Sequence, residues 1–220
     1  MTSGGVPLFL ASRSPRRQYL LGLLGVPFHV VVSHQDEAAI TPGEDLGQKV
    51  EKAAWAKVAS VLEEVREGVV VAADTVVFHQ GRVMGKPKDG EEAREMLLRL
   101  RGAEHLIITG VAMVRHPQGI SFAEHVTTVV KMRPYSLEEI VSYIATGDPL
   151  DKAGAYAIQN PAFHPGAKVV GCFLNVVGLP LCAVLRGLAA LGTAMDHPAV
   201  PSPHECSWCA GEAKISRCPG

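Results

Sequence analysis

The sequence lacks long hydrophobic runs and lacks an excess of charge of either sign. We find no apolar stretch of about 18 residues and no signal-peptide pattern in residues 1–7, so we expect no membrane span. The 21 Lys and Arg nearly balance the 22 Asp and Glu, which gives a net charge of −1. Such a balance gives no support for nucleic-acid binding, which favours a basic surface. A small anionic ligand stays open, because local clustering of cations matters more than net charge.

Cysteines are few, and their positions divide the chain into two parts. Two of the five lie in apolar segments, so we expect a reducing cytoplasm. The other three lie near the end, and we predict one domain over residues 1–192 and a tail over residues 193–220. The tail supplies four candidate zinc ligands, which are His204, Cys206, Cys209 and Cys218. A flexible tail with free thiols is the alternative, and the sequence leaves both interpretations open.

Strand and helix patterns alternate before the tail, without an internal repeat. Strand patterns cover residues 6–11, 28–33, 69–78, 105–115, 120–132 and 167–177, with a short strand around Val83. Helix patterns cover residues 15–24, 44–65, 136–145 and 181–191 and the segment between Asp89 and Gly102, and a polar loop spans residues 147–161. Hairpins add antiparallel pairs, so we predict an α/β fold with a mixed twisted sheet flanked by helices.

Residues 12–17 form the first candidate binding site. They join a predicted strand to a predicted helix with Ser14 as its N-cap and Pro15 as its first residue. A helix N-terminus offers unpaired N–H groups and a partial positive charge, which suit a phosphate group. Arg16 and Arg17 add bidentate donors for phosphate oxygens. The alternative is a capped surface helix with solvated charges.

Asp74 is the second candidate, because it interrupts a strand of Val and Ala and is followed by the polar residue Thr75. A carboxylate inside an apolar strand is costly unless it is paired or binds a cation. Asp74 could therefore hold Mg²⁺ or orient an attacking water. A buried Asp that bonds to the backbone is the alternative.

Four further positions are weaker candidates when each is taken alone. Lys86 and Lys57 are mobile point charges that suit phosphate, although solvated lysines are common. Glu37 follows a predicted strand and is either a metal-facing carboxylate or part of an ordinary loop. Gln159 ends a segment of small and polar residues, where its donor and acceptor could read the edge of a base. The alternative for that segment is a structural loop.

Six short motifs follow one another along the chain. They are LASRSPRR at 10–17, ADTVV at 73–77, GKP at 85–87, TGV at 109–111, DKAGAY at 151–156 with IQ at 158–159, and NVVGLP at 175–180. Together they closely resemble the Maf family of nucleoside triphosphate pyrophosphatases, over about residues 7–191. The resemblance implies an α/β cleft similar to that of the inosine triphosphate pyrophosphatases. It also implies hydrolysis of a nucleotide to its monophosphate and pyrophosphate with a divalent cation, Mg²⁺ or Mn²⁺.

The resemblance also assigns roles to the candidate residues. Asp74 matches the family's proton acceptor, and Glu37 matches a cleft acid that we expect to hold the metal together with Asp74. The positions linked to substrate choice are Arg16, Thr75 and Gln159. The basic residues expected to face the phosphates are Arg17, Lys57 and Lys86.

The motifs at 14–17 and 151–156 look like those of the family branch that acts on dTTP and UTP. Residues 157–160 and 171–174 depart from the usual family pattern near the base end of the cleft, which affects the substrate more than the reaction. A pyrophosphatase for other or modified nucleotides and a nucleotide-binding regulator of cell division are the alternatives. We expect a nucleotide as the partner, and the oligomeric state stays open, with a homodimer among the alternatives.

Overall fold

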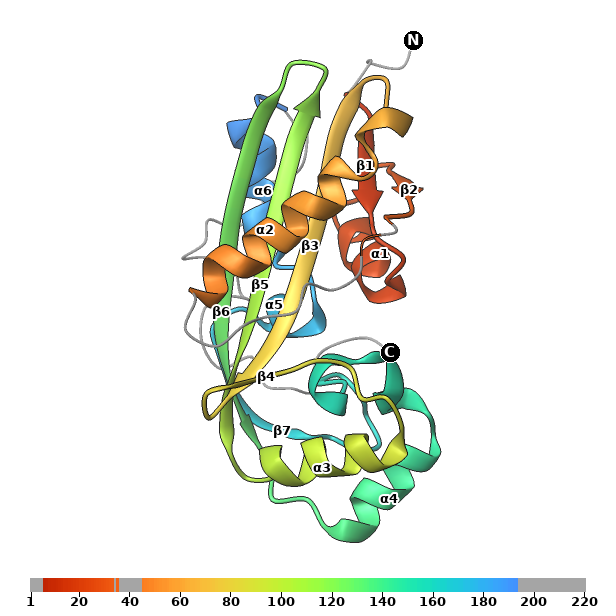
Figure 1. Ribbon diagram of the computed structural model, residues 1–220, viewed down its shortest axis with the longest axis vertical. Helices are drawn as coiled ribbons and strands as arrows, with labels where there is room; N and C mark the ends of the chain where they lie inside the picture. Colours follow the sequence, from red (N-terminus) through yellow and green to blue (C-terminus); the bar gives the residue numbers. More distant parts are fainter. Residues whose placement is uncertain (1–5, 34, 36–44, 194–220) are drawn as a thin grey trace.

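The computed structural model describes residues 6–33, 35 and 45–193, and within them seven strands form one mixed sheet (Figure 1). The spatial order is β2-β1-β3-β5-β6-β7, and β4 pairs with β3 outside this path. The strands are β1 (Leu8–Ala11), β2 (His29–Val31), β3 (Gly68–His79), β4 (Arg82–Met84), β5 (Glu104–His116), β6 (Ile120–Met132) and β7 (Gly166–Val170). Strand β1 runs parallel to both of its neighbours, and the other pairs are antiparallel. The predicted α/β class with a mixed sheet is confirmed.

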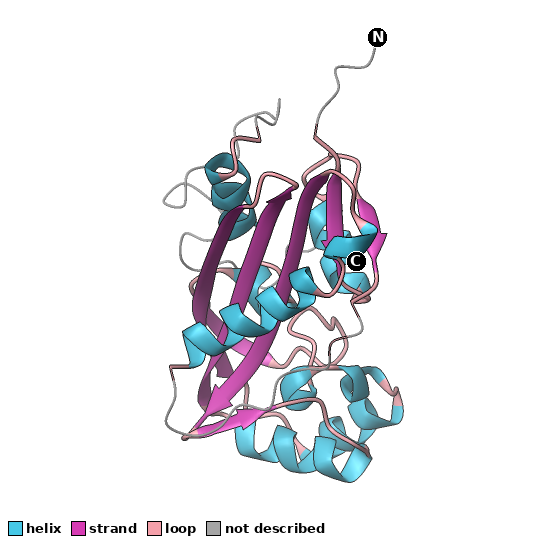
Figure 2. Cartoon of the chain, turned by 45° about the horizontal axis from the view of Figure 1, so that its top comes forward, coloured by secondary structure: helices cyan, strands magenta, loops and turns pink. Residues whose placement is uncertain are grey.

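Helices cover both faces of this sheet and add a second lobe at one end. Helix α2 crosses one face of β3, β5 and β6, and α1, α5 and α6 lie on the opposite face (Figure 1). Helices α3 and α4 form the second lobe with the 3₁₀ segments η2 and η3 (Figure 2). The bounds are α1 (Pro15–Gly22), α2 (Leu46–Ala59), η1 (Leu62–Glu64), α3 (Gly90–Leu100), α4 (Leu137–Ala145), η2 (Asp148–Asp151), η3 (Ala153–Ala155), α5 (Phe173–Val177) and α6 (Leu181–Ala190).

Strand β3 lies inside the sheet, between β1 and β5, and both of its faces are buried. Side chains alternate along a strand, so Val69, Val71 and Ala73 enter the large core on one side. Val70 and Ala72 enter a second core beneath α2. This burial on both faces explains the nearly continuous run of Val and Ala, and the predicted buried strand over residues 69–78 is confirmed.

One edge of β3 is covered by two different strands that leave a gap between them. Strand β1 pairs with residues Val69 to Val71, and β4 pairs with residues Val77 to His79. Between them, residues 72–76 have no strand partner on this side among the described residues. The other edge of β3 pairs with β5 over the same stretch. The gap is therefore an opening in the sheet where side chains from both faces can meet.

Local capping signals place the helices where the sequence predicts them. The side chain of Ser14 accepts a hydrogen bond from the backbone N–H of Arg17, with Pro15 in the first turn of α1. The side chain of Asp89 caps α3, and Ser136 forms a capping box with Glu139 at the start of α4. These three helix starts are confirmed.

Three segments differ from the predictions. Residues 167–177 are not one strand, because Gly171 takes a φ of +118° after β7 and the chain then turns into α5. Helix α2 begins later than predicted, after its N-cap Asp45, and ends at Ala59, so η1 replaces its predicted last turns. The predicted loop at 147–161 contains η2 and η3. The predicted zinc ligands of the tail lie outside the described residues.

Candidate active site

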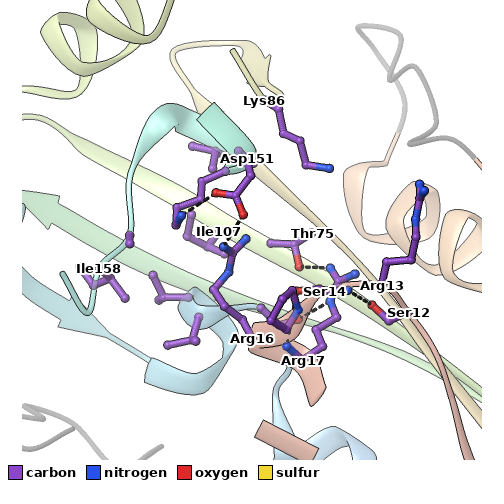
Figure 3. A pocket seen from close by; sticks show the side chains of 18 of the residues that line it. Ser12, Arg13, Ser14, Arg16, Arg17, Thr75, Lys86, Ile107, Asp151 and Ile158 are labelled. Carbon is purple, nitrogen blue, oxygen red and sulfur yellow. Dashed lines mark hydrogen bonds and ion pairs between the residues drawn. The ribbon is translucent and has the colours of Figure 1, made fainter. Parts of the chain in front are cut away.

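A cavity of about 550 Å³ opens at the gap in the edge of β3. The start of α1 forms one wall, η2 and η3 form the facing wall, and β3 and β5 contribute the floor (Figure 3). Six of the predicted binding residues line this single cavity, and they are Arg16, Arg17, Lys57, Thr75, Lys86 and Gln159. Residues that are scattered over more than 140 positions of the sequence are therefore brought together by the fold.

The α1 wall carries two arginines that are held in different ways. The Nε of Arg17 donates to the carbonyl oxygen of Gly178 at 2.9 Å, and its Nη2 donates to Oγ1 of Thr75 at 3.0 Å. Arg16 instead reaches across the cavity, where its Nη1 lies 3.2 Å from Oδ2 of Asp151. Because a guanidinium is planar and always charged, Arg17 is fixed as a cation at the floor while Arg16 links the two walls.

Asp74 is buried and forms an ion pair with the Nζ of Lys57 from α2. The same Nζ lies 3.4 Å from the carbonyl oxygen of Ala73. Lys57 lines the cavity, whereas Asp74 itself is not among the lining residues and contacts the cavity through Lys57. A buried carboxylate needs such a partner, because unpaired burial of a charge costs several kcal/mol.

Gly110 on β5 lets α2 approach the sheet beside this ion pair. Gly110 is the register partner of Asp74, and a Cβ at this position would lie 2.3 Å from the backbone carbon of Val50. The helix backbone therefore rests directly on the strand. Lys57 lies two turns further along the same helix, and the close approach keeps its amine within reach of Asp74.

Thr75 points to the opposite face of the sheet from Asp74, although the two residues are neighbours in sequence. Its hydroxyl contacts Arg17 and also lies 2.9 Å from Oγ1 of Thr109 on β5. The sequence places the acid and the hydroxyl side by side, but the alternation of a strand separates them. Thr75 lines the cavity directly, whereas Asp74 is linked to the cavity through its ion pair with Lys57.

The facing wall is a charged network built on η2. Nζ of Lys152 lies 2.9 Å from Oδ1 of Asp148 and also pairs with Asp151. Partial burial alone would raise the pKa of Asp151, but the hydrogen bond and charge of Lys152, with those of Arg16, outweigh burial and hold this pKa below its usual value. Asp151 therefore stays anionic and holds two cations at the rim.

The small residues of this wall serve packing against β3. Gly154 has a φ of +71°, and a Cβ there would lie 3.1 Å from Cγ2 of Val77. The backbone N–H of Gly154 donates to the carbonyl oxygen of Gly85, next to Lys86. These small residues therefore let η3 approach β3 closely. Lys86 and Gln159 reach the cavity from the two segments that this contact joins.

Comparison with known proteins supports the family resemblance that the sequence motifs indicate. The family described as Maf-like protein matches residues 7–191. The chain belongs to the Maf family. A Dictyoglomus turgidum protein named dTTP/UTP pyrophosphatase is 44% identical over 174 residues, which cover 79% of this chain and 90% of that protein. A Symbiobacterium thermophilum protein of the same name is 44% identical over 185 residues, covering 84% of this chain and 94% of that protein.

Of the two predicted cation ligands of this Maf domain, Asp74 lies within the described residues, where its carboxylate pairs with Lys57 beside the cavity. Glu37, the other predicted ligand, lies outside the described residues. Within residues 6–33, 35 and 45–193, no group of three or more His, Cys, Asp or Glu has a metal-binding arrangement. Mg²⁺ often takes only one or two carboxylates, because substrate phosphates and waters complete its octahedron. The oxygen chemistry of Asp74 therefore fits such a cation.

Sequence reasoning gave no role to two polar residues of the Maf motifs that lie deep in the core. Thr109 and Asn175 are both fully buried. The Nδ2 of Asn175 donates to Oγ1 of Thr128 at 2.9 Å and to the carbonyl oxygen of Val126 at 3.0 Å, which ties α5 to β6. A polar residue inside an apolar run was the signal that could have identified both.

In the described part of the chain, no helix has the length and hydrophobicity that a membrane crossing requires.

Proposed function

We propose that this Maf protein hydrolyses dTTP and UTP to the nucleoside monophosphate and pyrophosphate. The observation that carries the proposal is the convergence of four cationic side chains on one cavity beside a buried acid. These side chains are Arg16, Arg17, Lys57 and Lys86, and the acid is Asp74. A triphosphate is strongly anionic, so cations fixed in a partly enclosed site stabilise it more than they would in bulk water.

The choice of dTTP and UTP rests on the relatives. Proteins that are 42–44% identical to this chain bear the name dTTP/UTP pyrophosphatase. The similarity covers most of this chain and most of each relative. It favours the pyrophosphatase over a non-catalytic regulator of cell division. A cytoplasmic location completes the proposal, because the domain has few cysteines and they lie in apolar segments, which is typical of proteins from a reducing compartment.

The roles of the residues follow from their contacts. Arg17 is pre-positioned by Gly178 and Thr75, so it can bind an anion with little loss of side-chain entropy. Lys86 extends toward the cavity from the segment after β4 (Figure 3). Asp74 accepts the proton of the attacking water, and Lys57 orients its carboxylate. One water is consumed, the bond between the α- and β-phosphates breaks, and one proton is released.

A divalent cation, Mg²⁺ or Mn²⁺, is part of the proposal. Asp74 would hold it together with the phosphates of the substrate, and Glu37 is the second predicted ligand. When bound, the cation supplies charge neutralisation at the phosphate oxygens. Removal of the cation with a chelator is expected to stop turnover.

The test is a panel of normal and modified triphosphates assayed with Mg²⁺ or Mn²⁺, with both products identified by chromatography. We expect UTP and dTTP to give the monophosphate and pyrophosphate in equal amounts. Release of inorganic phosphate with a nucleoside diphosphate would contradict the proposal, since it means cleavage at the γ-phosphate. Faster turnover of a modified nucleotide by more than about tenfold would instead move the substrate assignment to that nucleotide.

A further inference from the structure

The cavity wall that follows η3 ends in a tight turn. The backbone N–H of Asn160 donates to the carbonyl oxygen of Ala157 at 3.1 Å. Ile158 and Gln159 are therefore the two central residues of a β-turn. Ala157, Ile158 and Gln159 line the cavity, whereas Asn160 is not among the lining residues. The conformation of this turn determines how the wall faces a ligand.

Both flanks of the turn are tied to one carboxylate oxygen of Asp148. Nδ2 of Asn160 donates to Oδ2 of Asp148 at 3.1 Å. On the other flank, the backbone N–H of Ala157 donates to the hydroxyl of Tyr143 at 2.9 Å, and this hydroxyl donates to the same Oδ2 at 2.6 Å. Oδ1 of Asp148 lies 2.9 Å from Nζ of Lys152, at the start of the same wall. Asp148 is not among the cavity-lining residues, so it can act on a ligand only through these partners.

The chemistry of these contacts leaves one orientation for the amide of Asn160. Partial burial alone would raise the pKa of Asp148, but the hydrogen bonds of Tyr143 and Lys152 outweigh burial and hold this pKa below its usual value. An ionised carboxylate can only accept, so the amide must present its NH₂ group to Asp148. Its Oδ1 accepts from the backbone N–H groups two and three positions further along, at 3.1 and 2.8 Å. One amide therefore joins Asp148 to the chain on the far side of the turn.

The turn lies at a part of the cavity that suits a nucleoside. Ile158 lies at the opposite end of the close-up from Ser12 and Arg13 (Figure 3). Its chain neighbours Tyr156 and Ala157 line the cavity as well. The cations proposed to bind the phosphates come from α1, α2 and the segment after β4 instead. An uncharged nucleoside suits an apolar wall better than a triphosphate does.

We propose that Asn160 is a positioning residue that, through Asp148, holds the turn at 157–160 in the conformation that receives the nucleoside of the bound nucleotide. The proposal rests on the proposed function. A turn that is already fixed loses less conformational entropy on binding, so the contact raises affinity without taking part in the reaction. Residues 157–160 depart from the usual family pattern, so the family resemblance does not imply this role.

The experiment measures the binding of UMP and of pyrophosphate, the two proposed products, together with the kinetics of UTP hydrolysis. Asn160→Ala removes the amide, so the turn must be ordered when the nucleoside binds. We expect the Kd of UMP and the KM for UTP to rise by about tenfold, the scale of one hydrogen bond. The Kd of pyrophosphate and kcat should stay near those of the wild type, because the lost binding is common to substrate and transition state. Titration calorimetry with Mg²⁺ present measures both dissociation constants.

Asn160→Asp tests the contact with Asp148 separately. It keeps an oxygen for the two backbone N–H groups but places a second carboxylate against Asp148, so it should weaken UMP binding at least as much as Asn160→Ala. Gln118→Ala is the matched control, because it removes an exposed side-chain amide from the turn between β5 and β6, outside the cavity lining. Its dissociation constants and kinetics should equal those of the wild type.

Two results overturn the proposal. One is a folded Asn160→Ala or Asn160→Asp variant that binds UMP as tightly as the wild type. The other is an equal loss of affinity for UMP and pyrophosphate in Asn160→Ala, because that is the result of a general structural defect. Melting temperatures show which variants are folded, and Asn160→Gly replaces Asn160→Ala if the latter does not fold.

The wild-type assay keeps this proposal separate from the proposed function. If the wild type does not convert UTP to UMP and pyrophosphate, the proposed function fails. If it does so and UMP binding is insensitive to Asn160, only the inference about Asn160 fails.

Discussion

The two faces of the sheet beside the cavity carry different kinds of polar side chains. The α2 face buries a charged pair, Lys57 with Asp74, over the close contact of α2 with Gly110. The opposite face carries neutral groups next to the cation of Arg17, namely the partly exposed hydroxyl of Thr75 and the buried hydroxyl of Thr109. Consecutive residues of β3 belong to different faces, so one strand supplies an acid and a hydroxyl without placing them in contact. Variants on the two faces should therefore differ in their effects on turnover and on nucleotide choice.

The largest expected effect is on the charged face. Asp74→Asn should lower kcat by ~10²–10⁴, because the variant cannot accept a proton from water. It should also lower stability by roughly 3–5 kcal/mol, because Lys57 keeps a buried charge without its partner. Steady-state kinetics and denaturant unfolding measure the two effects. A turnover equal to that of the wild type would remove Asp74 from the reaction.

A double variant separates the two roles of that pair. Asp74→Asn with Lys57→Met removes both charges, so stability should recover toward that of the wild type while turnover does not. Glu124→Gln is a matched control, because Glu124 pairs with Arg186 outside the cavity lining. If the double variant regains turnover together with stability, the loss in Asp74→Asn was a folding defect.

The second-largest expected effect is a loss of stability at low pH, and it concerns a neutral histidine on the face opposite α2. His105 lies on that face of β5, is buried, and contacts the hydroxyl of Tyr156 at 2.6 Å. Burial, with a smaller contribution from His79, lowers the pKa of His105 to about 4. This value is below that of the unfolded chain, so the unfolded chain binds more protons between the two values. Stability should therefore fall by about 3 kcal/mol as the pH falls from ~6.5 to ~4.

Unfolding measured at several pH values tests this expectation. His105→Gln keeps a polar contact for Tyr156 and should flatten the decline over that window. His29→Gln changes an exposed histidine and should leave the decline as it is. A decline of the same size in His105→Gln would assign the acid sensitivity to other groups.

The smallest expected effect concerns the contact that supports the charged face. Gly110→Ala places a methyl group against the backbone of Val50, so α2 must move away from β5. We expect a loss of about 1–3 kcal/mol in stability, with a fall in kcat as Lys57 shifts from Asp74. The preference among nucleotides should stay unchanged, because Thr75, which the family resemblance links to substrate choice, lies on the other face.

Gly22→Ala is the control for that substitution. A Cβ at Gly22 would lie 4.0 Å from Phe28, which is an ordinary contact, and alanine favours the helix. Its stability should equal or exceed that of the wild type. Equal effects of Gly110→Ala on kcat and on nucleotide selection would break the comparison between the two faces.

The parts of the fold that the sequence predicts are those with local signals. The caps at Ser14 and Ser136 involve residues three positions apart, and the apolar run of β3 reflects burial on both faces. The prediction of one strand over residues 167–177 was wrong, because this apolar run forms a strand and then a buried helix, which periodicity alone does not separate. The predicted binding residues share one cavity, but their functional roles stay predictions.

What the sequence could not predict depends on contacts between distant residues. Asp151 pairs with Arg16 over 135 positions, and Asn175 reaches Thr128 over 47. No local pattern specifies such partners. The separation of Asp74 from Thr75 follows from strand alternation, yet which helix covers each face is decided by the packing of the whole sheet.

The gap in the edge of β3 also has a consequence for solubility. A bare strand edge is a template on which another chain can add a strand, and long flat edges promote aggregation. Here β1 and β4 occupy the two ends of that edge, so an incoming strand would find only a few residues to pair with. The opening can expose backbone to a small ligand while it remains too short for intermolecular sheet growth.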